Sequence, residues 1–408
     1  MSPPSVEVTV TEPPRRFPSG YVDGVRPSHH LNNSKTRFTN PWPSFRIQTF
    51  SQWVSFFFKV TLRTPDLPQN VKSLIPTQTP TWGSEVGNQS SAKATWLGHA
   101  CYLVELPTPP GATRGVRIIF DPVFSNRCSP FQRLGPARYT DTPCKVEEIP
   151  AVDAVVLSHN HYDQYASSLC HSESKPIDNM SSTDIPTLRT IFAKPSSSAH
   201  MFVALNNAAY LSKAIHTPLS RVHELDWWDE RILHVALPSD TGGPAVNTEV
   251  RLSCTPSQHV SGRTVTDRWH ALWAAWVVDD LQSQKKVYFA GDTGYRTVSD
   301  GEDEEKVPVC PAFAEVGERF GGVDVALLPI GAYSPRAIMS NMHASPSDAV
   351  RIFKDVRAKK ALAMHWGTWV LTSEPVLEPP ALLKTECEKA GFGPDDFLVP
   401  ALGETVFF

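Results

Sequence analysis

The sequence has no Cys-x-x-Cys pair, no long apolar run and no excess of charge of one sign. Its seven cysteines are scattered and odd in number, which argues against a disulfide framework and against a cysteine-based zinc site. No stretch of about 18 apolar residues occurs, so we expect no membrane-spanning helix. Met1–Glu12 contains no apolar signal segment. These absences favour a protein of a reducing compartment, and cytoplasmic is the expectation.

The charge balance also excludes a class of partner. A net charge of -4 over 408 residues gives no electrostatic reason to expect binding to nucleic acid. Hydrophobic residues make up 41% and charged residues 20%, as in a globular protein with a sizeable core. The 37 prolines imply many loops and strand ends, which disfavours a helical bundle.

The chain divides into an N-terminal arm with a linker, residues 1–93, and one domain, residues 94–408. Residues 1–45 are rich in Pro, Ser and Arg and are expected to form an extended arm. The strongly apolar run Phe50–Val60 is predicted to be a helix or strand that covers the core. The alternative is an exposed apolar surface that contacts a lipid aggregate or a partner chain.

Short β-branched or apolar segments follow residue 93 and predict buried strands. They are Ala94–Glu105, Val116–Asp121, Ala154–Leu157, Met201–Leu205, Glu249–Cys254, Leu272–Val278, Lys286–Ala290, Val323–Pro329 and Ala361–His365. Helices are predicted at Pro186–Lys194, Asn207–Ala214 and Pro346–Lys359. The last has Ser345 as N-cap, Pro346 at its first position and Asp348 in its first turn. This mixture indicates an α/β domain with two sheets.

Two histidines and an aspartate follow the predicted strand at Ala151–Leu157. The segment reads Ser158-His159-Asn160-His161-Tyr162-Asp163, and functional groups in layered α/β proteins often lie just past a strand end. Such a cluster is costly to bury unless something binds it, and a divalent metal is the simplest candidate. The alternative is a surface turn that happens to contain two histidines.

Three later strands also end next to metal-ligand residue types. His259 follows one strand, Asp292 in a Gly-Asp-Thr-Gly segment follows another, and His365 follows a third. A single histidine after a strand is more often a hydrogen-bonded core residue than a ligand. Four strand ends of this kind together predict a metal centre.

This order of motifs resembles the metallo-β-lactamase superfamily, and more narrowly the N-acylphosphatidylethanolamine-hydrolysing phospholipase D family. The matching segments run from residue 40 to the C-terminal region. They are Asn40–Pro43, Trp96–Ala100, Asp121–Ser125, His159–Asp163, Glu224–Trp228, Thr255–His259, Ala290–Tyr295, Ile330–Tyr333 and His365–Thr368. The resemblance implies the αβ/βα sandwich, in which two mixed β-sheets pack between helices.

The resemblance also implies a role for each matching residue. His159, His161 and His259 would hold a first zinc ion, Asp163 and His365 a second, and Asp292 would bridge the two. Asp163 or Asp292 would orient the attacking hydroxide, which is held by the metal. His343 would contact the substrate phosphate or assist the leaving group, although a purely structural histidine is the alternative. Tyr162 is a further candidate for substrate contact.

Gln164 departs from the resembling family, which has a histidine ligand of the second metal at this position. A glutamine offers a neutral oxygen, which is a weaker and harder ligand for zinc than an imidazole. The second site would then be weakened, or would hold Mn²⁺ or Fe²⁺. Three hypotheses stay open: Gln164 still coordinates; one metal remains, with Asp163 acting as a general base; or the pocket is remodelled for another substrate.

The resulting expectation is a phosphodiesterase of phospholipase D type that acts on N-acylphosphatidylethanolamine-like lipids. The alternatives are a hydrolase of a lactone, ester or thioester, and a degenerate member without catalysis. The resemblance further suggests a homodimer, and the apolar run Phe50–Val60 suggests a peripheral contact with a membrane. The Ser-rich stretch Cys170–Asp184 is expected to be a surface loop; alternatively, it folds over the metal site.

Overall fold

The structure is a computed structural model that describes residues 6–16, 26–47, 67–84, 87–128, 135–160, 184–194, 197–262 and 267–408. Three features singled out in the sequence lie outside these residues. They are the apolar run Phe50–Val60, the stretch 161–164 with its predicted ligands, and nearly all of the Ser-rich stretch. The predictions made for them therefore stay predictions.

Two mixed β-sheets form the framework of the described residues. The larger sheet has the strand order β1-β8-β9-β10-β11-β12-β13-β14, and the smaller has the order β15-β2-β3-β4-β5-β6-β7. In the larger sheet β1 to β11 pair antiparallel, whereas β11 to β14 pair parallel. In the smaller sheet the change from antiparallel to parallel pairing comes at β4. This architecture confirms the predicted fold class.

The strands are short and mostly apolar. The larger sheet contains β1 (Glu7–Thr11), β8 (Glu230–Leu237), β9 (Val246–Thr255), β10 (Ala275–Asp280), β11 (Lys286–Phe289), β12 (Val323–Pro329), β13 (Ala358–Met364) and β14 (Phe397–Leu398). The smaller contains β2 (Lys93–Gly98), β3 (Cys101–Glu105), β4 (Arg117–Phe120), β5 (Ala154–Val156), β6 (His200–Ala204), β7 (Val222–Leu225) and β15 (Thr405–Phe407).

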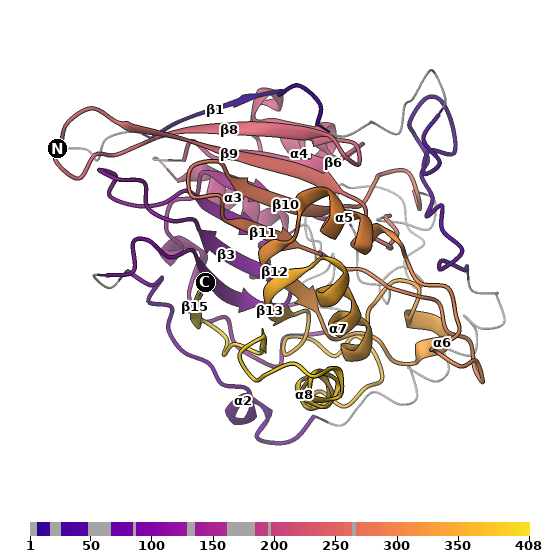
Figure 1. Cartoon of the computed structure of the whole chain (residues 1–408). Coiled ribbons are helices and arrows are strands. Elements are labelled where there is room, and N and C mark those ends of the chain that lie inside the picture. Colours follow the sequence, from indigo (N-terminus) through magenta and orange to yellow (C-terminus); the bar gives the residue numbers. More distant parts are fainter. Residues whose placement is uncertain are drawn as a thin grey trace.

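Helices cover the outer faces of both sheets. They are α2 (Val71–Leu74), α3 (Ile185–Ala193), α4 (Ala208–Ala214), α5 (Ala312–Phe320), α6 (Arg336–Met339), α7 (Pro346–Asp355) and α8 (Glu378–Ala390), with the 3-10 turns η1 (Val146–Glu148) and η2 (Leu219–Arg221). Helix α7 packs on β12 and β13, whereas α4 packs on β7; α5 and α7 lie in front of the larger sheet in Figure 1. Among the described helices, none has the length and apolar character needed to cross a bilayer.

The core lies between the two sheets and is rich in aromatic side chains. The rings of Phe120 on β4 and Phe289 on β11 lie 4.7 Å apart across this interface. Both side chains are fully buried, as are those of Trp96 and Trp276. Since helices cover the outer faces, parallel strands such as β12 are buried along their whole length, which explains their continuous apolar sequences.

The predicted elements are largely present, with differences at turns and ends. The apolar segment Ala94–Glu105 is two strands, because the chain turns at Gly98 and His99, whose φ angles are +104° and +50°. Helix α7 has the predicted Ser345 cap, whose side chain accepts from the backbone N–H of Asp348. It ends at Asp355, earlier than predicted, because the following residues begin β13 and pair with β12.

The N-terminal arm is fastened to the rest of the chain by specific bonds. Its first residues form β1, a strand that was not among the predicted strands and that pairs with β8. Further along, His29 and His30 each place Nε2 within 2.9 Å of a different carboxylate oxygen of Asp226. Asn40 Nδ2 donates to the backbone carbonyl of His259 at 2.7 Å. The arm therefore contacts a loop that carries a predicted metal ligand.

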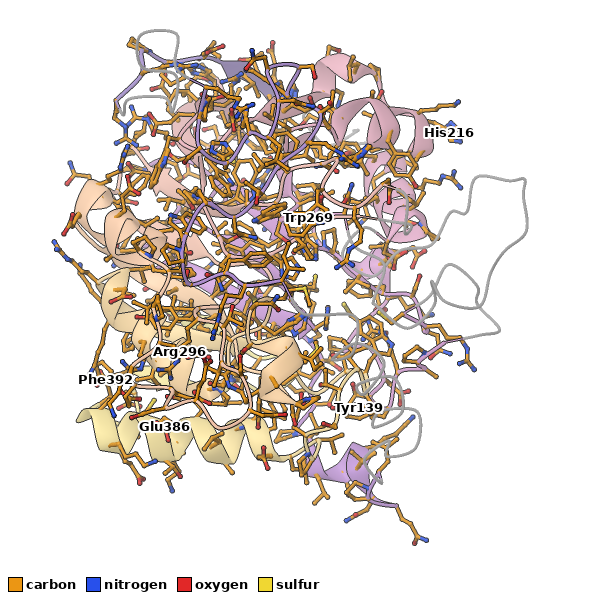
Figure 2. All side chains as sticks on the ribbon, turned by 90° about the vertical axis from the view of Figure 1, so that its right-hand side faces the viewer. Tyr139, His216, Trp269, Arg296, Glu386 and Phe392 are labelled. Carbon is orange, nitrogen blue, oxygen red and sulfur yellow. The ribbon has the colours of Figure 1, made fainter. Side chains whose placement is uncertain are left out.

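A buried ionic network holds the loops after β11 and β12 together. Arg296, labelled in Figure 2, is 1% exposed and donates Nε–H to the carboxylate of Asp348 at 2.8 Å. The other oxygen of Asp348 lies 2.8 Å from a guanidinium nitrogen of Arg336, and Glu304 contacts both arginines. Asp348, which is fully buried, is therefore the carboxylate on which two cations depend.

We predict that Asp348→Ala lowers the free energy of unfolding by about 3–5 kcal/mol, because it removes the buried carboxylate that Arg296 and Arg336 share. The matched control is Asp303→Ala on the surface, which should leave the stability nearly unchanged. Urea unfolding followed by tryptophan fluorescence measures both. Equal effects of the two substitutions would contradict a structural role for this network.

Candidate metal centre

Five loops bring ligand-type side chains to one place between the sheets. His159 follows β5, His259 follows β9, Asp292 follows β11, His365 follows β13, and His99 lies in the turn between β2 and β3. All five residues are at most 6% exposed. The strands of both sheets thus deliver their loops to a common edge, as the sequence predicted for four of the five.

The five side chains form two groups that share one carboxylate. The ligand atoms of His159, His259 and Asp292 all lie within 4.8 Å of one another, and so do those of His99, Asp292 and His365. The Oδ2 atom of Asp292 is 3.0 Å from His365 Nε2 and 3.6 Å from His159 Nε2. A carboxylate between two sets of imidazoles is an arrangement that can bridge two metal ions.

Hydrogen bonds behind the ligands fix the orientation of two imidazoles. His259 Nδ1 lies 2.9 Å from the carbonyl oxygen of Met342 and donates to it. His159 Nδ1 lies 2.7 Å from the hydroxyl of Ser158, and the backbone N–H of Ser158 donates to Asp121 at 2.8 Å. In each histidine Nδ1 is thus bonded to the protein, and Nε2 is the atom that would act as a metal ligand, as is common where outer hydrogen bonds orient metal-binding histidines.

Gly291 lets the loops after β5 and β11 approach closely. Its φ is +59°, and a Cβ atom at this position would lie 2.4 Å from the Cβ of Ser158. Any larger residue would push Asp292 away from His159, so the glycine before Asp292 is required by the geometry of the site.

The protonation states of the site suit a divalent cation. Burial lowers the pKa of His159 to about 4, so its imidazole is neutral at pH 7. Although burial by itself raises the pKa of Asp292, the charge and hydrogen bond of His365 hold that pKa well below its ordinary value. The neutral imidazole of His159 and the ionised carboxylate of Asp292 are the forms that bind metal. The residues present therefore fit the divalent metal that the arrangement implies.

His343 lies beside both groups but belongs to neither. Its ring centroid is 5.4 Å from that of His259 and 5.2 Å from that of His365. Burial and the nearby His365 lower its pKa to about 3, and its Nδ1 has no hydrogen-bond partner among the described residues. A neutral imidazole with a ring nitrogen still to be bonded can contact a substrate.

A recess opens next to the second group. It is a small recess, with a cavity volume of about 30 Å³, and is lined by His99, His365 and the side chains of a loop that follows β13. Its walls include Trp366, Trp369 and Tyr139, the last labelled in Figure 2. The aromatic walls provide an apolar surface in direct contact with the metal-ligand residues.

Sequence reasoning found four of these residues and missed one. His159, His259, Asp292 and His365 lie together as predicted, and their roles as ligands remain a prediction. His161, Tyr162, Asp163 and Gln164 lie outside the described residues. His99 was not predicted as part of the site, although its segment Trp96–Ala100 carried the resemblance. The position of His99, directly after a glycine at a strand end, was the signal that could have identified it as part of the site.

Comparisons with known proteins agree with this geometry. The family model described as the beta-lactamase superfamily domain matches residues 116–366. The N-acyl-phosphatidylethanolamine-hydrolyzing phospholipase D 1 of Caenorhabditis elegans is 30% identical over 361 residues, which are 85% of each chain. The mitochondrial N-acyl-phosphatidylethanolamine-hydrolyzing phospholipase D of Saccharomyces cerevisiae is 29% identical over 91% of this chain and 75% of that protein.

A further relative comes from a bacterium. An uncharacterized protein of Mycobacterium tuberculosis is 31% identical over 296 residues, 72% of this chain and 63% of that protein. The family match covers more than half of the chain, and the worm relative is similar along most of its own length. The chain therefore belongs to the metallo-β-lactamase superfamily of hydrolases, as a relative of the N-acylphosphatidylethanolamine-hydrolysing phospholipases D.

Proposed function

We propose that this hydrolase is a phosphodiesterase of phospholipase D type that acts on N-acylphosphatidylethanolamine-like lipids. Water would add to phosphorus, the bond from phosphorus to the ethanolamide oxygen would break, and an N-acylethanolamine and a phosphatidic acid would leave. The observation that carries the proposal is the position of Asp292, between His159 and His259 on one side and His99 and His365 on the other. The names of the two eukaryotic relatives support the choice of substrate.

Two divalent ions, which we propose to be zinc, suit this donor set. Bound there, they supply Lewis acidity, which lowers the pKa of water and stabilises charge on phosphoryl oxygens. The chain's own contribution is to hold the donors rigidly: Asp292 is placed by Gly291, and His259 by its bond to Met342. Asp163 stays a predicted ligand and orienting group, and Mn²⁺ or Fe²⁺ in the second site stays an alternative.

Substrate contacts are proposed for His343 and for the recess. The neutral imidazole of His343 lies beside both ligand groups and can donate a hydrogen bond to a phosphoryl oxygen. Trp366 and Trp369 line the recess next to His365 and provide an apolar wall for an aliphatic part of a lipid. Tyr162 remains a further predicted contact.

Hydrolysis of a lactone, ester or thioester is the second candidate. Gln164, in place of the histidine of the resembling family, favours it, because a changed second site alters which reaction the same fold supports. A member that binds a ligand without turnover is the third. The large number of ligand-type residues brought together argues against that third possibility.

The wider setting of the activity is also a proposal. A lipid substrate requires access to an aggregate, and the apolar run Phe50–Val60 is the proposed peripheral contact. The sequence favours the cytoplasm, whereas the yeast relative is named as mitochondrial. A homodimer is proposed from the resemblance alone, and no nucleic-acid partner is expected.

We predict that the purified protein releases N-acylethanolamine and phosphatidic acid from mixed micelles of N-acylphosphatidylethanolamine. A panel of lactones, esters and thioesters is assayed beside the lipid, with products identified by mass spectrometry. The phosphodiester should be turned over with the highest kcat/KM. Turnover of a lactone or thioester in the absence of lipid cleavage would favour the second candidate function.

We predict that Asp292→Asn lowers kcat by about 100-fold or more, because the amide replaces the charge shared by both ligand groups. The variant should remain folded, which circular dichroism and thermal unfolding check. Asp303→Asn, on the surface, is the matched control and should retain full activity. Near-normal turnover by a folded Asp292→Asn protein would rule out the proposed site.

A further inference from the structure

The second ligand group contains an imidazole that the sequence motifs did not assign. Besides Asp292 and His365 it includes His99, with the ligand atoms of all three within 4.8 Å of one another. The motif after β5 has Gln164 in place of a histidine. The motif after β5 thus lacks this histidine, whereas the turn after β2 places one, His99, next to this group.

The ring of His99 faces the ring of His365. Their centroids are 4.2 Å apart and their planes are inclined by 42°, so the rings are tilted against each other. On another side, Trp369 approaches His99 edge-on at 4.9 Å, and only 5% of His99 is exposed. The ring is therefore held between an aromatic wall and the metal-ligand residues.

The backbone of His99 is fixed to the loop that carries His365. Its N–H donates to the hydroxyl of Thr368 at 2.8 Å. Its carbonyl oxygen accepts from the backbone N–H of His365 and from Trp96 Nε1, both at 2.9 Å. This three-way attachment keeps the relative placement of the two histidines constant, as two ligands of one metal ion require.

The conformation of His99 is unusual for a residue with a side chain. Its φ is +50°, in the left-handed region that only a few per cent of non-glycine residues adopt, with asparagine, aspartate and histidine enriched among them. Residues held in this region often occur at functional sites, where the surroundings enforce the strain. A glycine would be the unstrained choice for this turn, so a histidine at this position carries a conformational cost.

The described residues offer the imidazole of His99 no hydrogen bond, because the bonds of this residue are made by its backbone. Buried polar side chains nearly always have a partner. His159 and His259, by comparison, each have Nδ1 engaged with the protein. Instead, one ring nitrogen of His99 lies within 4.8 Å of the ligand atoms of Asp292 and His365, and the residue lines the recess.

We propose that His99 is a ligand of the second metal ion and supplies the imidazole that is absent at position 164. The existence of a second metal rests on the proposed function. Among the described residues, the proposal assigns that metal to His99, Asp292 and His365, and Asp163 stays a predicted ligand beside them. It replaces the hypothesis that the site depends on the amide oxygen of Gln164. The second site then has two imidazoles and a carboxylate, a donor set that suits zinc.

The first test is the metal content of the full-length protein after equilibration in a zinc buffer, with binding constants from chelator competition. The wild-type chain and Gln164→Ala should each bind two equivalents. His99→Gln should keep one tight equivalent and lose about tenfold or more in affinity for the other. His223→Gln, a histidine on β7 outside both groups, is the matched control and should bind like the wild type.

Two outcomes would overturn the proposal. One is a His99→Gln protein with both affinities unchanged; the other is a wild-type chain that binds a single equivalent at saturating zinc. Loss of the second metal in Gln164→Ala with unchanged binding in His99→Gln would assign the site to Gln164 instead. All variants are checked by circular dichroism before loading.

A second measurement does not depend on loss of binding. In His99→Cys loaded with Co²⁺, a thiolate at position 99 that contacts the metal produces a thiolate-to-cobalt charge-transfer absorption band. The cobalt-loaded wild type, which retains its own cysteines, is the control and should lack the band. Absence of the band in a folded variant with two bound cobalt ions would overturn the proposal.

These measurements also separate the proposal from the proposed function. The metal content and the cobalt spectrum are measured without lipid. They therefore report which residues bind the metal, whatever the substrate is. A chain that loses its second metal in His99→Gln but cleaves only lactones would keep the metal assignment and lose the lipid activity. If the wild type cleaves the lipid and His99→Gln binds metal like the wild type, the proposed function is kept and the assignment of His99 as a ligand is lost.

Discussion

The structure depends on keeping one carboxylate ionised in the space between two sheets. Asp292 is 6% exposed, and a buried carboxylate is stable as an anion only if hydrogen-bond donors or cations surround it. Here imidazoles surround it on both sides. The residues around Asp292 are constrained as well. Gly291 must have no side chain if the loop is to lie against Ser158, and the backbone N–H of Ser158 donates to Asp121. Burial raises the pKa of Asp121 to about 8, so even this outer layer is tightly enclosed.

Segments far apart in the sequence hold the loops around Asp292 in place. The N-terminal arm supplies Asn40, which bonds the backbone of His259, so a residue more than 200 positions away supports a ligand of the first group. On the other side, Arg296 lies four residues after Asp292 and is bound by Asp348, at the start of α7. Because α7 begins just after His343, this ion pair helps to set the spacing between the shared carboxylate and His343, together with the bond from the backbone N–H of Ala344 to the carbonyl of Thr293 at 2.7 Å.

Much of the fold could be predicted because its signals are local. Continuous apolar runs indicate strands that are covered on both faces, and Ser345 followed by Pro346 marks a helix start. The end of α7 was predicted too late, since pairing of β13 with β12 outweighs the helical propensity of the residues concerned. The strand β1 was missed because the arm was judged by its composition, although Val6-Glu7-Val8-Thr9-Val10-Thr11 alternates as a strand does. Only its edge pairing with β8 is a tertiary feature that the local pattern does not specify.

The sequence by itself determined the types of residue at four strand ends, and with them a metal-dependent hydrolase of this superfamily. The tertiary structure decided how these residues are grouped: which histidines share Asp292, and that His99 joins His365. The physical reason lies in the range of the interactions. Strand and cap signals act over a few residues, whereas the position of His99 follows from a left-handed turn and from bonds to a loop more than 260 residues later.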